Sequence, residues 1–392
     1  MTEIQSPSSS PLNVDAEAWA RPFEGAVLSD IVLRRDALPD LSPTVLLHAG
    51  PPFDAEVPYA VRNACVQALL FEGLAVDEAH ARAMLSTGAV ELQPAQDHGI
   101  ATPLAQVVSA SMPLAEVGDA FGVAWAPLAE SPPPALRFGT SAPGARARLA
   151  AIAEFGMQRL APLLREHPVA LSSIVISALV NGDECHARTG VANTALIDAI
   201  AGLGVDDRAA LRANPGFVLT VLMAAACWRL RCATRGLAAV GGNGIAFGLR
   251  LHGDSRWHRQ PATPPIGTRM PGHAEVEALG AIGDSAVIDF CGLGGQALTA
   301  APALRDEWRE VLPDALALRR AAVVDPVTGL VDTARVVASG LSPLVDLAIL
   351  DRQGERGLIG RGVYMPDVAL FADALESSAP AFVPSTPARE IS

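Results

Sequence analysis

The strongest constraint on the fold is a change of pattern along the chain, from alternating strand and helix signals to helical periodicity and back. Residues 145–237 carry helical spacing almost throughout, beginning with Leu149 and Ile152 on one face. Residues 25–135 and 238–376 instead contain short β-branched runs separated by Gly, Pro and helical segments. We therefore predict a mixed α+β protein, with two α/β domains at 25–135 and 238–376 around an all-helical domain at 145–237.

The two ends of the chain are predicted to be disordered tails. Residues 1–24 and 377–392 include Ser- and Pro-rich stretches with little apolar material for a core. Within the C-terminal block, the apolar runs at 286–290 and 336–340 are predicted to be short strands.

The charge and composition exclude several classes of function. A net charge of −13 and an isoelectric point near 5.1 argue against nucleic acid or an anionic membrane as a partner. All 29 basic residues are arginine, because the chain contains no lysine. Schiff-base chemistry, a lysine-bound pyridoxal group and a lysine-containing phosphate loop are therefore excluded. Binding of phosphate or carboxylate would depend on arginine, glycine-loop amides and helix N-termini.

The cysteines and the apolar runs predict the compartment. The 5 cysteines are odd in number and show no Cys-x-x-Cys pairing, which fits a reducing environment. The N-terminus lacks the basic and apolar regions of a signal peptide, and the longest apolar run, 217–228, is too short to span a bilayer. We predict a soluble cytoplasmic protein with no cofactor and no bound metal.

One stretch places polar side chains where a core is expected. Asn181 begins a turn, and helical spacing from there puts Asp183, His186, Thr189 and Asn193 on one face. The same face continues as isoleucines, so the polar groups should point inward, where they need partners or a function. The functional interpretation is a histidine and a carboxylate converging on a ligand, and the structural alternative is an interhelical polar network.

Two residues of the first block are further candidates. His48 ends a short strand before a Gly-Pro-Pro turn, a common position for a functional side chain. Glu72 follows an apolar helix face, where partial burial would suit it to acid–base work; the alternative is a helix-end carboxylate in solvent. A metal site is the less favoured interpretation, because it needs a third ligand from His48 or His98 besides Asp183 and His186.

Two glycine-rich loops, 241–244 and 292–295, are candidate anion sites made of backbone amides. Arg250 and Arg256 lie near the first loop in sequence and strengthen this interpretation. Asp284 follows a glycine and is predicted either to cap a helix or to contact substrate.

Eight short motifs occur in the same order as in one known family. They are residues 46–52 (LLHAGPP), 70–73 (LFEG), 109–113 (SASMP), 137–139 (RFG), 182–186 (GDECH), 243–248 (NGIAFG), 283–286 (GDSA) and 292–295 (GLGG). Together they resemble the large-subunit family of oxamate carbamoyltransferase, the AllG/YlbE-like proteins, over residues 44–372. The resemblance implies two α/β portions around a helical insert and carbamoyl transfer between a small amide or amine and phosphate, at the end of allantoin and purine nitrogen breakdown. It also implies several subunits, including an FdrA-like partner and another small partner.

The residues and the resemblance together predict a site between domains. His186 would act as the base with Asp183 orienting it, while Asn243 and neighbouring amides hold an oxyanion or phosphate. The predicted catalytic residues are His186, Asp183, Glu184, His48 and Glu72. The predicted substrate-binding residues are Gly50, Ser111, Asn193, Asn243, Gly244, Arg250, Asp284, Gly294 and Gly295.

Two other functions remain open from the sequence. An amidohydrolase of a small cyclic or linear amide would use the same groups with water in place of phosphate. A non-catalytic subunit would act only as the scaffold of a multi-subunit transferase. We also expect the chain to form a homo-oligomer.

Overall fold

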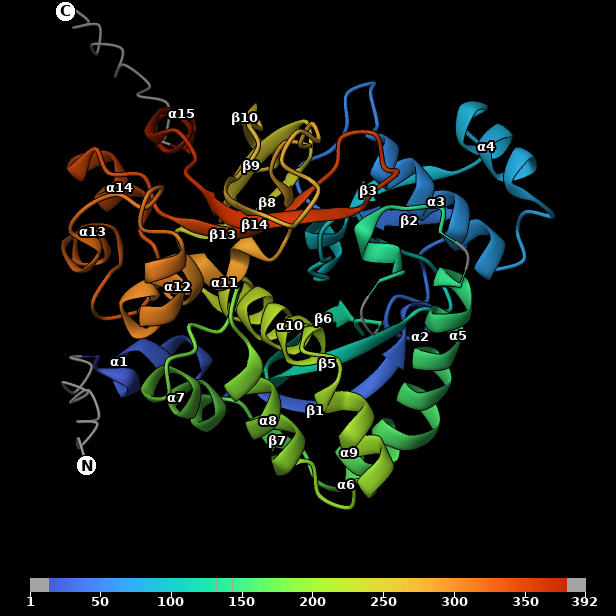
Figure 1. Ribbon diagram of the computed structural model, residues 1–392, viewed down its shortest axis with the longest axis horizontal. Coiled ribbons are helices and arrows are strands. Elements are labelled where there is room, and N and C mark those ends of the chain that lie inside the picture. The colour runs from blue at the N-terminus through green and yellow to red at the C-terminus, as the bar shows by residue number, and fades with distance from the viewer. Residues whose placement is uncertain (1–13, 131–132, 143, 379–392) are drawn as a thin grey trace, which may run out of the picture.

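The computed structural model describes residues 14–130, 133–142 and 144–378. Within these residues, four sheets are surrounded and separated by helices (Figure 1), which confirms the mixed α+β class. The first sheet has the order β6-β5-β1-β7 and is antiparallel. Its strands are β1 (Val27–Leu33), β5 (Pro113–Asp119), β6 (Gly122–Pro127) and β7 (Val169–Ala170). β7 is a short strand inside the segment predicted to be all-helical.

The second sheet, β3-β2-β4, holds the strand that ends at His48. β2 (Val45–His48) pairs in parallel with β3 (Glu91–Pro94) and antiparallel with β4 (Val107–Val108). A parallel pair needs a crossover, and here α3 (Tyr59–Phe71) and α4 (Glu78–Ser86) supply it. All four residues of β2 are buried beneath these elements.

The other two sheets come from the C-terminal third of the chain. One has the order β10-β9-β8-β12, and the other β11-β14-β13. Their strands are β8 (Leu237–Asn243), β9 (Ala246–Leu251), β10 (His258–Pro261), β11 (Ile266–Arg269), β12 (Ile282–Gly283), β13 (Val345–Leu350) and β14 (Leu358–Tyr364).

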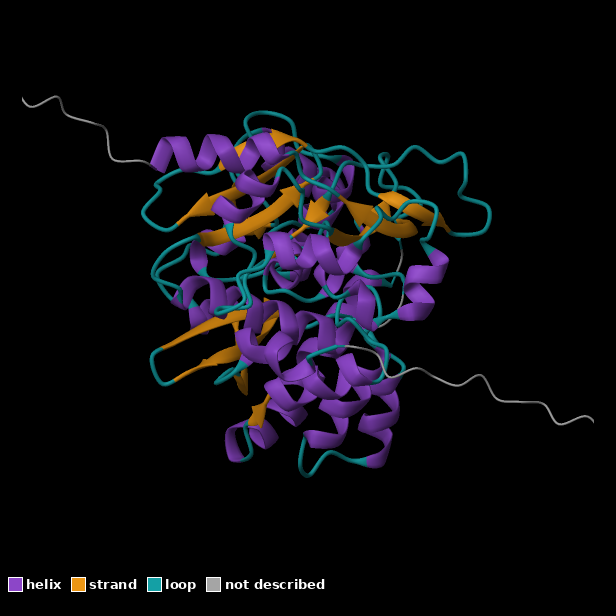
Figure 2. Ribbon diagram, turned by 90° about the vertical axis from the view of Figure 1, so that its left-hand side faces the viewer, coloured by secondary structure: helices purple, strands orange, loops and turns teal. Residues whose placement is uncertain are grey.

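A buried helical layer lies between the first sheet and these C-terminal sheets (Figures 1 and 2). α10 (Gly216–Cys232) packs on β5 and β6 and also touches β8, while α11 (Ala286–Phe290) packs on α10, β8 and β13. Twelve of the 17 residues of α10 are buried, so the helix has no polar face. No single described helix is long and apolar enough to span a membrane. The pair formed by α9 (Val205–Arg212) and α10, bent by 79°, reaches that length and composition only when its two helices are counted together.

The remaining helices cover the outer faces. They are α1 (Ala16–Ala20), α2 (Arg34–Ala37), α5 (Ala145–Phe155), α6 (Ala161–Glu166), α7 (Ser172–Val180), α8 (Gly190–Ala199), α9 (Val205–Arg212), α12 (Pro302–Glu307), α13 (Leu316–Val323), α14 (Thr333–Ser339) and α15 (Val368–Ser378). Short 3-10 turns lie at Arg21–Phe23, Ala95–His98, Leu136–Phe138, Gly294–Gln296 and Leu298–Ala300, and a π turn at Gly156–Leu160.

The predicted tails are wrong where the structure describes them. Residues 16–23 form α1 and a 3-10 turn, with Asp15 accepting a hydrogen bond from the Ala18 amide and Phe23 fully buried. Serine 377 belongs to α15. The apolar surface of Phe23 explains the order at the N-terminal end, since burying it offsets the entropy of ordering the segment. Residues 1–13 and 379–392 lie outside the described part of the chain.

Two predicted strands are helices. Residues 286–290 form α11, and residues 333–339 form α14. The Asp332 carboxylate accepts a hydrogen bond from the Arg335 amide at the start of α14, and Gly340 ends the helix at φ +65°. These caps outweigh the strand preference of the two valines between them. A short apolar run buried on all sides, such as 286–290, carries no period that separates a strand from a helix.

Candidate functional site

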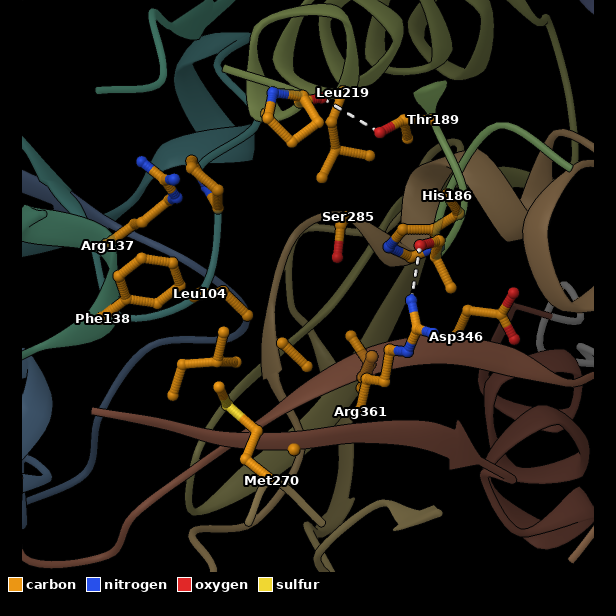
Figure 3. A pocket seen from close by; sticks show the side chains of 18 of the residues that line it. Leu104, Arg137, Phe138, His186, Thr189, Leu219, Met270, Ser285, Asp346 and Arg361 are labelled. Carbon is orange, nitrogen blue, oxygen red and sulfur yellow. Dashed lines mark hydrogen bonds between the residues drawn. The ribbon is translucent and has the colours of Figure 1, made fainter. Parts of the chain in front are cut away.

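A cavity of about 540 Å³ lies where α10, α11, β11, β13 and β14 approach one another. Figure 3 shows Leu219, Leu104, Phe138 and Met270 around it, together with polar groups that include His186 and Ser285. Several of these side chains lie on loops or at helix starts, where the chain ends its regular structure and can present them to a ligand. Most of the surface that the cavity exposes is apolar.

His186 is the titratable group best placed for chemistry in this cavity. Its ring points into the cavity (Figure 3), and its Nδ1 lies 2.9 Å from Oδ2 of Asp289, on α11. Both side chains are at least nine-tenths buried. The other two contacts of the Asp289 carboxylate are with backbone N–H groups, so the carboxylate acts as an acceptor, and we assign the proton to Nδ1 of His186. Nε2 is therefore the basic nitrogen, and it has no hydrogen-bond partner among the described residues.

Backbone amides fix Asp289 in place. Oδ1 of Asp289 accepts hydrogen bonds from the amides of Gly295, at 2.7 Å, and Asp346, at 3.0 Å. The loop can come this close because Gly294 has no side chain. A Cβ added there would lie 2.3 Å from Oδ1 of Asp289 and 3.0 Å from Cβ of His186. The glycine loop thus holds the His186–Asp289 pair.

Two further carboxyl groups are buried beside this pair. Oε1 of Glu184 accepts hydrogen bonds from the amides of His186 and Arg188, while Oε2 has no partner. Burial, more than any neighbouring charge, raises the pKa of Glu184 to about 7. Neither oxygen of Asp346 has a partner, and burial, followed by repulsion from Asp289 and Glu184, raises its pKa well above the ordinary range. Of these three carboxyl groups, Asp289 is the one with a hydrogen bond at both oxygens.

Three arginines line the cavity, and two of them are already paired. Arg137 contacts Glu130, at 3.1 Å, and stacks on Phe138, while Arg361 binds Glu307 with two nitrogens, at 3.1 and 2.6 Å. Arg269, at the end of β11, has no ion-pair partner among the described residues, and its Nη1 is buried without a hydrogen bond. The cavity therefore holds one cationic group that a ligand anion can neutralise.

Comparisons with known proteins identify the family. The family described as oxamate carbamoyltransferase subunit AllG matches residues 90–285. The chain belongs to this family. It is also 29% identical to the oxamate carbamoyltransferase subunit AllG of Escherichia coli (strain K12) over 376 residues, 85% of this chain and 89% of that protein. The uncharacterized protein YahG of the same strain is 28% identical over 380 residues, 87% of this chain and 80% of YahG.

A solved structure shares the fold. A conserved protein of unknown function from Enterococcus faecalis V583 matches with a TM-score of 0.79 and 26% identity, over 92% of this chain and 96% of that one.

The helix predicted to begin at Asn181 is wrong, and this changes the partner of His186. Residues 181–189 form a loop with Cys185 at φ +71°, and α8 begins only at Gly190. Asp183 does not contact His186. It accepts hydrogen bonds from the amides of Cys185, Val191 and Ala192, at 2.9, 2.8 and 3.1 Å. Its carboxylate therefore caps α8 from eight residues away, which the helical projection could not represent.

His48 and Glu72 do not line the cavity that His186 faces. The Nδ1 atom of His48 contacts the Ala49 carbonyl at 2.9 Å, Nε2 is buried without a partner, and burial lowers its pKa to about 4. Glu72 accepts hydrogen bonds from the Ser109 hydroxyl and the Ser111 amide, both at 2.6 Å. The Ser111 hydroxyl contacts Arg35. In this AllG-family chain, the hydrogen bonds of Glu72 with Ser109 and Ser111 tie the end of α3 to the loop before β5.

Asp284 joins several of the motifs by hydrogen bonds. Its oxygens accept from the Gly50 amide at 2.8 Å, the Gln96 side chain at 2.6 Å and the Thr102 amide at 2.8 Å. Burial raises the pKa of Asp284 to about 7. A Cβ on Gly50 would lie 2.4 Å from the Gly242 carbonyl carbon, so the strand ends can approach only because Gly50 is glycine.

The other predicted binding residues lie outside the cavity, and most have protein partners. Asn243 donates to the Pro51 carbonyl and accepts from two amides of the turn that contains Gly244. Asn193 bridges α9 and α10, as expected for the interhelical network weighed above. Arg250 lies 3.4 Å from Asp97. The amides of Gly294 and Gly295 donate to the Glu184 carbonyl and to Asp289.

Sequence reasoning missed Asp289, Asp346, Arg269 and Ser285 as site residues. A usable signal was present for the first two, because each is an aspartate inside an otherwise apolar run, where a buried charge needs a partner. Among the described residues no group of three or more His, Cys, Asp or Glu side chains has the arrangement of a metal site.

Proposed function

We propose that this chain binds a small N-carbamoyl substrate in the cavity beside His186 and takes part in carbamoyl transfer to phosphate. One observation carries the proposal: the His186 ring, whose Nε2 has no hydrogen-bond partner among the described residues, points into a cavity of a chain that belongs to a carbamoyltransferase subunit family. Carbamoyl phosphate is an activated compound, so the transfer needs an anion site, a donor for the carbonyl oxygen and an acid–base group rather than a covalent nucleophile.

The proposed step is balanced by His186. In the direction that forms carbamoyl phosphate, a phosphate oxygen attacks the carbamoyl carbon, the C–O bond forms, the C–N bond breaks, and protonated His186 gives its proton to the departing nitrogen. In reverse, Nε2 removes a proton from the attacking nitrogen while phosphate leaves. The Asp289 carboxylate keeps the imidazole oriented. The Ser285 hydroxyl, without a hydrogen-bond partner among the described residues, is proposed to donate to the carbonyl oxygen.

The relative from Escherichia coli is called a subunit, which favours a second candidate. In that case the chain binds ligand while a partner, such as an FdrA-like subunit, completes the catalytic site. The pathway we propose is the breakdown of purine or allantoin nitrogen.

The experiment compares the chain alone with the chain co-purified with its partner subunits. Carbamoyl phosphate formed from an N-carbamoyl substrate is measured with and without phosphate. Replacing His186 with Ala should lower turnover by roughly 10²–10⁴-fold, the usual contribution of acid–base catalysis. Replacing the exposed His167 with Ala is the matched control.

The outcomes separate the candidates. Wild-type turnover in the His186→Ala chain would refute the proposed base. Turnover that needs no phosphate would indicate an amidohydrolase. If the chain is active only with the partner subunits, and His186→Ala does not change that activity, the non-catalytic role is favoured.

A further inference from the structure

The lining of the cavity points to a substrate larger and less polar than oxamate, and this inference rests on the proposed function. A water-sized group takes roughly 30 Å³ of liquid volume, so the N-carbamoyl derivative of oxamate, with about nine non-hydrogen atoms, needs on the order of 300 Å³ at most. The cavity has about 540 Å³. Phosphate, with about five non-hydrogen atoms, takes on the order of 150 Å³ of the remainder, so the apolar character of the walls carries the inference.

The walls of the cavity are mainly apolar. Leu219, from the start of α10, Leu104 and Phe138 face Met270 across the space (Figure 3), and Leu347 and Leu358 come from the two strands β13 and β14. Small anions gain nothing from such walls, because each apolar contact replaces a hydrogen bond to water. An apolar group of a ligand gains about 0.8 kcal/mol for each methylene that it buries there, which corresponds to roughly a threefold to fourfold gain in affinity.

The charges of the cavity single out one arginine for the carboxylate of the ligand. Arg137 and Arg361 are neutralised by Glu130 and Glu307, and Arg269 is the cavity-lining arginine that has no ion-pair partner among the described residues. Its guanidinium is therefore left to pair with a carboxylate of the ligand. The polar groups His186 and Ser285 are left for the carbamoyl group.

We infer that this chain recognises N-carbamoyl monocarboxylates that carry an apolar side chain. The carboxylate binds Arg269, the carbamoyl group lies at His186 and Ser285, and the side chain lies against Leu219 and Met270. The reacting atoms are those of the proposed carbamoyl transfer, so the inference changes the substrate and leaves the chemistry unaltered.

The test is a calorimetric titration of the full chain, alone and with its partner subunits. The ligands are oxamate and the N-carbamoyl derivatives of glycine, alanine, valine and leucine. Affinity should rise by about threefold per added methylene along the N-carbamoyl series. Converting the carboxylate of the leucine compound to an amide should weaken its binding at least tenfold in the wild type, and this difference should vanish in Arg269→Gln.

A matched pair of variants tests the apolar wall. Leu219→Gln should reduce the ratio of affinities for the leucine and glycine compounds severalfold, whereas Leu318→Gln, at a position 72% exposed on α13, should leave that ratio unchanged. An affinity that stays flat or falls with side-chain size, with oxamate bound best, would overturn the inference while leaving the proposed function intact. Carbamoyl phosphate formation is measured separately on the same compounds, and its absence for all of them would refute the proposed function.

Discussion

Replacing Gly294 with Ala tests whether the glycine loop exists to hold His186 and Asp289 together. Gly294 has φ +49°, a conformation that costs an L-residue about 1–2 kcal/mol. Its new Cβ would also lie 2.3 Å from Oδ1 of Asp289, so the carboxylate or the loop must move. Overpacking of this kind typically costs a further 1–3 kcal/mol. We expect the free energy of unfolding to fall by about 2–5 kcal/mol.

The matched control is Gly340→Ala. Gly340 ends α14 at φ +65°, and a Cβ there would meet nothing within 4 Å. Gly340→Ala therefore has the same cost of a positive φ but no steric clash of the new Cβ, and its free energy of unfolding should fall by about 1–2 kcal/mol. Urea unfolding monitored by circular dichroism gives both values, with the slope of each transition showing whether the unfolding remains comparable.

The same pair of variants separates stability from function. Displacing Asp289 weakens a charge-assisted hydrogen bond to His186, which contributes about 1.5–3 kcal/mol. That loss corresponds to roughly a tenfold to hundredfold lower kcat, measured below the unfolding transition with the partner subunits present. Equal losses of stability in Gly294→Ala and Gly340→Ala, with full turnover in both, would refute this account of the loop.

Three further substitutions test the roles of the carboxylates around His186. Asp289→Asn should lower kcat roughly tenfold to hundredfold with the fold intact. Asp183→Asn should instead lower the free energy of unfolding by about 1–2 kcal/mol, with a smaller effect on kcat. The reverse pattern would show that Asp183 is the group that orients His186. Glu184→Gln tests the raised pKa of that carboxyl: between about pH 4.5 and 7 the folded wild type binds more protons than the unfolded chain, so its stability falls as pH rises. The stability of Glu184→Gln does not fall in this way. Its free energy of unfolding relative to the wild type, measured with urea, should therefore rise by on the order of a few kcal/mol between about pH 5 and pH 8. A difference between the two proteins that does not change with pH would contradict the assignment.

The sequence by itself determined the class of the fold and the location of the histidine. Strand and helix patterns predicted the mixed α+β class correctly because the periodicity of side chains is a local property of the sequence. The same patterns failed at residues 286–290, which lie in a core on every side and so show no polar face. They also failed at Asp183, where a carboxylate caps a helix that starts seven residues later, at Gly190. Lysine-dependent chemistry was excluded by composition alone.

Only the tertiary structure decided which groups meet. Asp289 is 103 residues from His186 in the chain, and Asp346 reaches the same cluster from a third element, β13. No spacing rule joins such residues, because their contact follows from the packing of α11 and β13 rather than from the geometry of one helix or strand. The motif at 182–186 gave the histidine, and the fold supplied the carboxylate that orients it and the apolar cavity that it faces.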